Sequence, residues 1–162
     1  MNDAGVLAKF LPDFARVEGM SLFNLYHNYT VDEHLLKTVG FMSKIINNTL
    51  SQPHPFTFNF NAKLDNKKVL LLSAFLHDIG KGRKQDHSIL GSQITEKLCN
   101  RIGMKKNEVS QVVWLVKNHL VMSDVAQKRD LYDPKTIVDF ASIVKNQKNL
   151  DYLLALTVAD IM

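Results

Sequence analysis

The hydrophobic and polar positions of the chain recur mainly with the spacing of α-helices. In residues 30–50, apolar positions return every three or four residues after a capping box that Thr30 and Glu33 can form. Residues 67–79 are apolar at almost every position, which predicts a central helix buried on nearly all sides. Residues 51–66 contain prolines and alternating phenylalanines, and we interpret them as a loop because no second strand is available for pairing.

Capping residues and apolar spacing predict further helices in the second half of the chain. These begin after Asp86, at about residue 107, after Asp133 and at about residue 150. No internal repeat and no change in composition marks a second domain. The sequence therefore predicts an all-α helical bundle, formed as a single domain over residues 1–162.

Length and composition agree with one ordinary globular domain. The chain has 162 residues, of which 46% are hydrophobic and 22% are charged, and a domain has typically about 150 residues. The longest apolar stretch, residues 69–76, is far shorter than the roughly 20 residues of a membrane-spanning helix. The N-terminus has no secretory signal, so we expect a cytoplasmic protein without a membrane partner. The single cysteine, Cys99, falls in a helical pattern and is expected to be a packed core residue.

The charge of the chain is mildly basic. Twenty Lys and Arg residues stand against sixteen Asp and Glu residues, which gives a net charge of +4. The basic residues are scattered or paired, without the long stripe that is typical of nucleic-acid binding, so we expect no nucleic-acid partner.

Several histidines and aspartates share an orientation toward the interior. Each lies on or at the inner face of a predicted helix, where a polar side chain without a partner is unfavourable. A divalent metal accounts for all of them at once, because neutral imidazoles and carboxylates are its natural ligands and helical bundles build such sites in their interior. Six separately hydrogen-bonded groups are the alternative. The candidate metal ligands are His34, His77, Asp78, His87, His119 and Asp160.

The order of these residues resembles the HD superfamily of metal-dependent phosphohydrolases, an all-helical fold with an interior metal site. The resemblance implies that His34, His77, Asp78 and Asp160 hold the first metal. His87 and His119 match the positions of the ligands that members with two metals add.

A closer resemblance covers nearly the whole chain. The strings FNLYHNYTVDEH (residues 23–34), LHDIGKGR (residues 76–83) and MSDVAQKRD (residues 122–130) resemble the central domain of the bifunctional uridylyltransferase/uridylyl-removing enzymes. This resemblance implies hydrolysis of UMP from a tyrosine of a uridylylated PII signal protein, with UMP as the product, in nitrogen regulation. Those enzymes also have a nucleotidyltransferase domain before this region and ACT domains after it, so we expect the chain to be a fragment.

A hypothesis of hydrolysis with a pair of metals suggests roles for particular residues. Asp78 is expected to bridge two metals, and Lys81 to stabilise the phosphate, so we take these two as catalytic residues. Arg83, Lys84, Lys128 and Arg129 are candidates for binding the nucleotide or PII, with a solvated surface as the alternative. We expect one or two divalent ions. Mixed His and carboxylate ligands suit Mn, Fe, Co, Ni or Zn better than Mg, and the resemblance implies manganese as the first choice.

Two other functions remain open from the sequence. An HD-type nucleotidase or cyclic-nucleotide phosphodiesterase would carry the same ligand pattern. A non-catalytic module that binds nucleotide or PII and signals to other domains would also be compatible with it.

Overall fold

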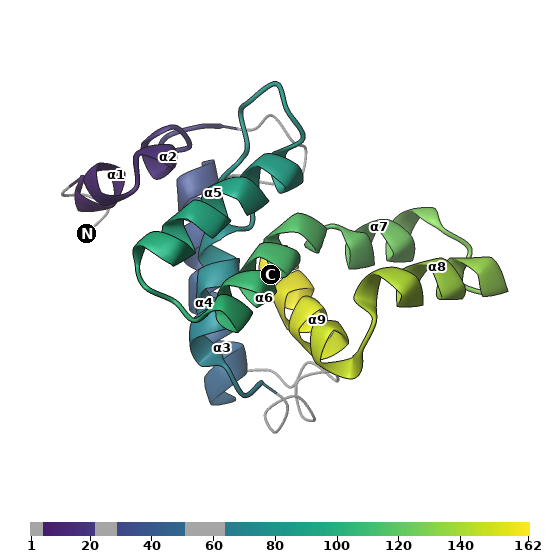
Figure 1. Ribbon diagram of the computed structural model, residues 1–162. Helices are drawn as coiled ribbons and strands as arrows, with labels where there is room; N and C mark the ends of the chain where they lie inside the picture. Colours follow the sequence, from purple (N-terminus) through teal and green to yellow (C-terminus); the bar gives the residue numbers. More distant parts are fainter. Residues whose placement is uncertain (1–4, 22–28, 51–63) are drawn as a thin grey trace.

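The computed structural model describes residues 5–21, 29–50 and 64–162, and helices dominate these residues (Figure 1). The described part contains an isolated bridge between Ser21 and Thr30 but no strand, so the predicted all-α class is confirmed. Most of the loop expected at residues 51–66 lies outside the described residues. The helices are α1 (Val6–Phe10), α2 (Pro12–Ala15), α3 (Val31–Asn47), α4 (Lys67–Leu76), α5 (His87–Arg101), α6 (Lys106–Asn118), α7 (Val121–Lys128), α8 (Pro134–Val144) and α9 (Gln147–Ile161).

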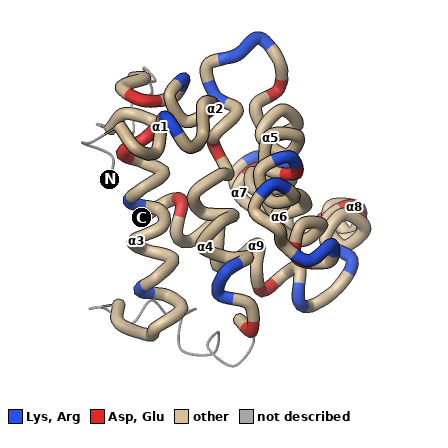
Figure 2. Tube along the Cα trace, turned by 60° about the vertical axis from the view of Figure 1, so that its left-hand side comes forward, with Lys and Arg blue, Asp and Glu red and all other residues tan. Residues whose placement is uncertain are grey.

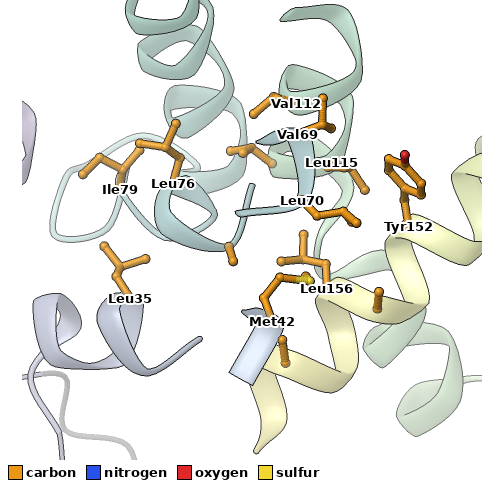
Figure 3. Close-up of a cluster of buried hydrophobic side chains, with 14 of the residues drawn as sticks. Leu35, Met42, Val69, Leu70, Leu76, Ile79, Val112, Leu115, Tyr152 and Leu156 are labelled. Carbon is orange, nitrogen blue, oxygen red and sulfur yellow. The ribbon is translucent and has the colours of Figure 1, made fainter. Parts of the chain in front are cut away.

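Helix α4 lies at the centre of the bundle and contacts α3, α6 and α9. Its Leu70 and Leu76 are fully buried, and Leu70 lies near Met42 from α3 and Leu156 from α9 (Figure 3). Burial of one such side chain stabilises a fold by about 1.5–3 kcal/mol. The central buried helix predicted from the apolar run is therefore confirmed, although it ends at Leu76, before the predicted boundary.

The capping residues fix where the helices begin. Thr30 and Glu33 form the expected capping box at the start of α3. The side chain of Asp86 accepts hydrogen bonds from the backbone N–H groups of Ser88 and Ile89 and so caps α5. Asp133 caps α8 in the same way through the N–H of Lys135.

The end of α4 packs directly against the start of α5. A Cβ atom placed on Gly80 would lie 2.2 Å from the carbonyl oxygen of His87 and 2.8 Å from the backbone nitrogen of Gly91. Only glycine fits at position 80 without displacement of backbone. This contact holds His77 and Asp78, which follow α4, beside His87, the first residue of α5.

Parts of the second half differ from the prediction. Helix α7 was not predicted, and α9 begins at Gln147, three residues earlier than expected. Helices α7 and α8 lie to one side of the bundle (Figure 1). The apolar row of α8 is consequently only partly covered, and the exposed fractions of Ile137 and Val138 are 51% and 65%.

The buried position expected for the single cysteine is confirmed. Cys99 is fully buried, and burial raises the pKa of its thiol to about 11, as expected for a packed core cysteine. Lys and Arg residues are spread over several elements (Figure 2). None of the described helices is long and apolar enough to span a membrane.

Candidate metal centre

The six candidate ligands come from five helices and meet in two groups. His34 lies in α3, His77 and Asp78 directly follow α4, His87 begins α5, His119 directly follows α6, and Asp160 lies near the end of α9. Within each group the ligand atoms lie within 4.8 Å of one another. The groups are His34, His77 and Asp160, and Asp78, His87 and His119.

The first group is closely spaced. The Nε2 atoms of His34 and His77 are 3.2 Å apart, and Oδ1 of Asp160 lies 2.8 Å from the former and 3.1 Å from the latter. Burial lowers the pKa of His77, but the carboxylates of Asp78 and Asp160 outweigh this effect and raise it to about 10. For Asp160, burial raises the pKa, but the neighbouring His77 and His34 lower it well below its ordinary value.

Asp78 connects the two groups through its two oxygens. Its Oδ1 atom lies 3.5 Å from Nε2 of His119 and 3.7 Å from Nε2 of His87. Its Oδ2 atom faces the first group, 3.4 Å from Nε2 of His77 and 3.9 Å from Nε2 of His34. One carboxylate thus offers one oxygen to each side, which is the arrangement expected of a bridging ligand.

The second group contains buried polar atoms that the protein does not satisfy. Oδ1 of Asp78, Nε2 of His87 and Nε2 of His119 are buried, and no described residue gives any of them a hydrogen bond. An unsatisfied buried polar atom costs about 1–3 kcal/mol. A cation coordinated by all three atoms removes this penalty, so the residues present fit a divalent metal.

Backbone carbonyls orient two of the imidazoles. Nδ1 of His77 donates to the carbonyl of Ala74 (2.9 Å), and Nδ1 of His119 donates to the carbonyl of Val116 (2.7 Å). A carbonyl oxygen only accepts, so Nδ1 carries the proton in both rings. In the neutral ring, Nε2 then presents its lone pair toward the centre, as metal-ligating histidines require.

A cavity of about 380 Å³ opens over this centre. Lys81 lines it, and the Nζ atom of Lys81 lies 2.5 Å from Oδ2 of Asp78. The cavity lining consists of Tyr29, Val31, His34, Asp78, Lys81, His119, Leu120, Ser123, Asp124, Gln127, Asp160 and Ile161. Among the described residues, Lys81 is therefore the lysine or arginine that lines the cavity above the candidate ligands.

The other predicted substrate-binding residues lie outside this lining. Arg83 pairs with Asp13 at 2.5 Å, and Lys128 pairs with Asp124 at 2.6 Å. Lys84 and Arg129 are exposed. Their role in binding a nucleotide or a protein stays a prediction.

Sequence reasoning missed the contribution of α7 to the cavity. Leu120, Ser123, Asp124 and Gln127 line it and have the spacing i, i+3, i+4 and i+7 of one helical face. Because α7 has only eight residues, its apolar spacing repeats over little more than two turns, too few to stand out from the flanking segments. The helical spacing of these four residues was the signal in the sequence from which this face could have been predicted.

The fold and the two ligand groups define an all-α protein with an interior site for divalent metal. The HD domain family model matches residues 31–160, which is most of the chain, so the chain belongs to the HD domain family. A curated relative is the bifunctional uridylyltransferase/uridylyl-removing enzyme of Erythrobacter litoralis (strain HTCC2594), to which it is 50% identical over 161 residues. The match covers 99% of the chain but 18% of the length of that relative.

Proposed function

We propose that this domain is a metal-dependent phosphohydrolase that removes UMP from a uridylylated tyrosine of a PII protein. The observation that carries the hydrolase assignment is Asp78, which offers one oxygen to each of two ligand groups beneath a cavity. The choice of substrate is supported by 50% identity to an enzyme named for uridylyl removal. The chain matches 18% of that enzyme, so its other activity is not assigned here.

One or two ions would be held by His34, His77, Asp160, Asp78, His87 and His119. Mixed nitrogen and oxygen ligands suit Mn, Fe, Co, Ni or Zn better than Mg, and the family resemblance makes manganese the first choice. A divalent metal supplies positive charge to phosphoryl oxygens and lowers the pKa of bound water to about 7. These residues thus make a hydrolytic reaction near neutral pH feasible.

Lys81 has a separate task in this proposal. Its ammonium group lies against Asp78 and also lines the cavity, so it adds positive charge beside that carboxylate and presents charge to the phosphate. The leaving group is a tyrosine phenolate, whose conjugate acid has a pKa of about 10. Because this phenolate leaves more readily than an alkoxide, strong general acid catalysis is not required.

The remaining expectations belong to the same proposal. Residues 1–162 form a single HD domain, in agreement with the one buried hydrophobic cluster of the described residues. Arg83, Lys84, Lys128 and Arg129 contribute charge to the surface that receives PII or the nucleotide. The cytoplasmic location stays a prediction from the sequence.

The direct test is release of UMP from uridylylated PII by the chain supplied with Mn²⁺, measured by chromatography. The proposal predicts UMP release that a chelator abolishes and that His77→Ala abolishes.

Dinucleotides, cyclic nucleotides and nucleoside triphosphates are assayed in parallel. Hydrolysis of these compounds without hydrolysis of uridylylated PII would contradict the substrate assignment and favour a nucleotidase or cyclic-nucleotide phosphodiesterase. Binding of PII without any turnover would favour a non-catalytic module.

A further inference from the structure

One wall of the cavity carries polar side chains that the metal site does not use. Leu120, Ser123, Asp124 and Gln127 lie on one face of the segment that forms α7, and all of them line the same cavity as Asp78 and Lys81. The hydroxyl of Ser123 is engaged, because it donates to the carbonyl of Leu120 at 3.0 Å. Among the described residues, Gln127 has no hydrogen-bond partner for its side-chain amide.

Asp124 is the unusual member of this wall. It belongs to neither group of metal-ligand atoms, yet it brings a carboxylate to a cavity that would receive an anionic phosphodiester. A carboxylate repels an anion unless it is neutralised or accepts hydrogen bonds from the bound molecule.

The present partner of Asp124 is easily displaced. Its Oδ1 atom lies 2.6 Å from Nζ of Lys128, and the exposed fractions of the two side chains are 51% and 68%. Exposed pairs with this i, i+4 spacing contribute only about 0.3–0.5 kcal/mol. The ion pair offsets the charge of Asp124 without preventing it from binding a hydroxyl-bearing ligand.

We propose that α7 is the nucleoside-binding wall of the cavity, with the Asp124 carboxylate accepting hydrogen bonds from the ribose 2′- and 3′-hydroxyls. The inference rests on the proposed function, because a nucleotidyl ester is the substrate that brings a vicinal diol next to its phosphate. A carboxylate that accepts from ribose hydroxyls is a frequent solution in nucleotide sites. Gln127, one turn further along the same face, provides an amide donor and acceptor for the edge of the base.

Two apolar residues of the cavity lining suit the tyrosine side of the phosphodiester substrate. Val31 at the start of α3 and Ile161 at the end of α9 are apolar and lie on elements other than α7. A tyrosine ring would be accommodated there, while its nucleotide would occupy the polar wall. The cavity would thus bind the nucleoside at its polar wall and the tyrosine ring at its apolar side.

Product binding tests the proposal without turnover. The affinity of the Mn²⁺-loaded chain for UMP and for 2′-deoxyuridine 5′-monophosphate is measured by isothermal titration calorimetry. A charge-assisted hydrogen bond to the 2′-hydroxyl predicts about tenfold tighter binding of UMP. Asp124→Ala reduces this preference to less than about twofold, because both nucleotides lose the hydrogen bond from the 3′-hydroxyl but UMP alone also loses the bond from its 2′-hydroxyl. Asp139→Ala, a change at an exposed position of α8, is the matched control and leaves the tenfold preference intact.

The same comparison is made with the p-nitrophenyl esters of the two nucleotides. Here Asp124→Ala is expected to raise KM more for the ribonucleotide ester than for the deoxyribonucleotide ester, which lacks the 2′-hydroxyl but keeps the 3′-hydroxyl. Equal affinity of the unaltered chain for both monophosphates, or a preference that survives in Asp124→Ala, would overturn the inference while ester hydrolysis still supports the proposed function. If no ester and no uridylylated PII is hydrolysed, the proposed function fails, and the calorimetric ratio still decides the role of Asp124.

Discussion

The Oδ1 atom of Asp78 and the Nε2 atom of His119 face each other at 3.5 Å, and no described residue gives either atom a hydrogen bond. Because Nδ1 of His119 donates to Val116, the neutral ring presents a lone pair to the carboxylate oxygen. Two acceptors at this distance repel each other unless a cation lies between them. The arrangement therefore makes binding of metal a direct source of stability.

The first prediction concerns this coupling of metal to folding. At a free Mn²⁺ concentration one hundred times Kd, binding stabilises the native chain by about 2.7 kcal/mol. For a domain of this size that corresponds to a rise in Tm of about 5–10 °C. Scanning calorimetry with added Mn²⁺, and again with chelator, measures the shift.

Asp78→Asn is expected to abolish most of this shift, because the amide no longer supplies a charged oxygen to each group. Asp139→Asn, at an exposed position of α8, serves as the control and keeps the shift. A Tm that does not respond to Mn²⁺ in the unaltered chain would contradict the assignment of the metal centre.

The candidate metal ligands could be singled out from the sequence because several of them stand in a strong helical context. His34 lies in α3, whose capping box and apolar spacing are clear in the sequence, and His77 and Asp78 end the most apolar segment of the chain. The bridging geometry of Asp78 was expected only through family resemblance. Its physical basis, the meeting of the α4 and α5 backbones at Gly80, depends on packing between segments that no local pattern reveals.

The second prediction separates the role of Lys81 from metal binding. Lys81→Ala removes the ammonium group from the cavity and is expected to lower kcat for phosphodiester hydrolysis by about 100-fold, as loss of one preorganised charge does. Manganese content, measured by mass spectrometry, is expected to stay unchanged because Lys81 is not a ligand.

Lys97→Ala, at an exposed position of α5, is the matched control for that experiment and retains the rate of the unaltered chain. If Lys81→Ala loses metal together with activity, Lys81 acts by positioning Asp78 and not on the phosphate. Full activity in Lys81→Ala would show that Lys81 has no part in the hydrolysis.

The third prediction tests the contact between α4 and α5. Gly80→Ala places a Cβ 2.2 Å from the carbonyl oxygen of His87, so the two backbones must separate. We expect a loss of about 1–3 kcal/mol in the free energy of unfolding, measured by urea denaturation. Hydrolysis is expected to fall as well, because the separation displaces His87 from Asp78.

Gly40→Ala provides a matched control within the same chain. A Cβ on Gly40, in the interior of α3, would have no neighbour within 4 Å among the described residues. Alanine there is expected to stabilise the helix by about 0.5–1 kcal/mol. Equal effects of the two substitutions would show that close packing at Gly80 is unimportant.

The sequence did not predict the regions whose structure depends on contacts between helices more than on the local spacing of apolar residues. Helix α7 has no buried residue, and its polar side chains face a cavity that other helices create. The apolar row of α8 predicted burial, but Ile137 is half exposed in the described structure. Hydrophobic spacing identifies the face of a helix, whereas the partner that covers this face lies elsewhere in the chain.

The last prediction is a pH dependence that originates away from the metal centre. Glu108, in the first turn of α6, accepts hydrogen bonds from Nζ of Lys68 at 2.8 Å and from the side chain of Asn66 at 3.0 Å. These contacts lower the pKa of Glu108 from its ordinary 4.5 to about 2. Because the folded pKa is the lower one, the stabilising contribution is complete above pH 4.5 and is lost progressively as the pH falls toward 2.

Glu108→Gln removes the titrating group while keeping a similar shape. The difference in free energy of unfolding between the unaltered chain and this variant is expected to be largest at pH 7 and to shrink by pH 3, as measured by urea denaturation. Glu96→Gln, at an exposed position of α5, is the control and should show a small difference that does not change with pH. A difference for Glu108→Gln that stays constant from pH 7 to pH 3 would mean that the contacts with Lys68 and Asn66 do not depend on the charge of Glu108.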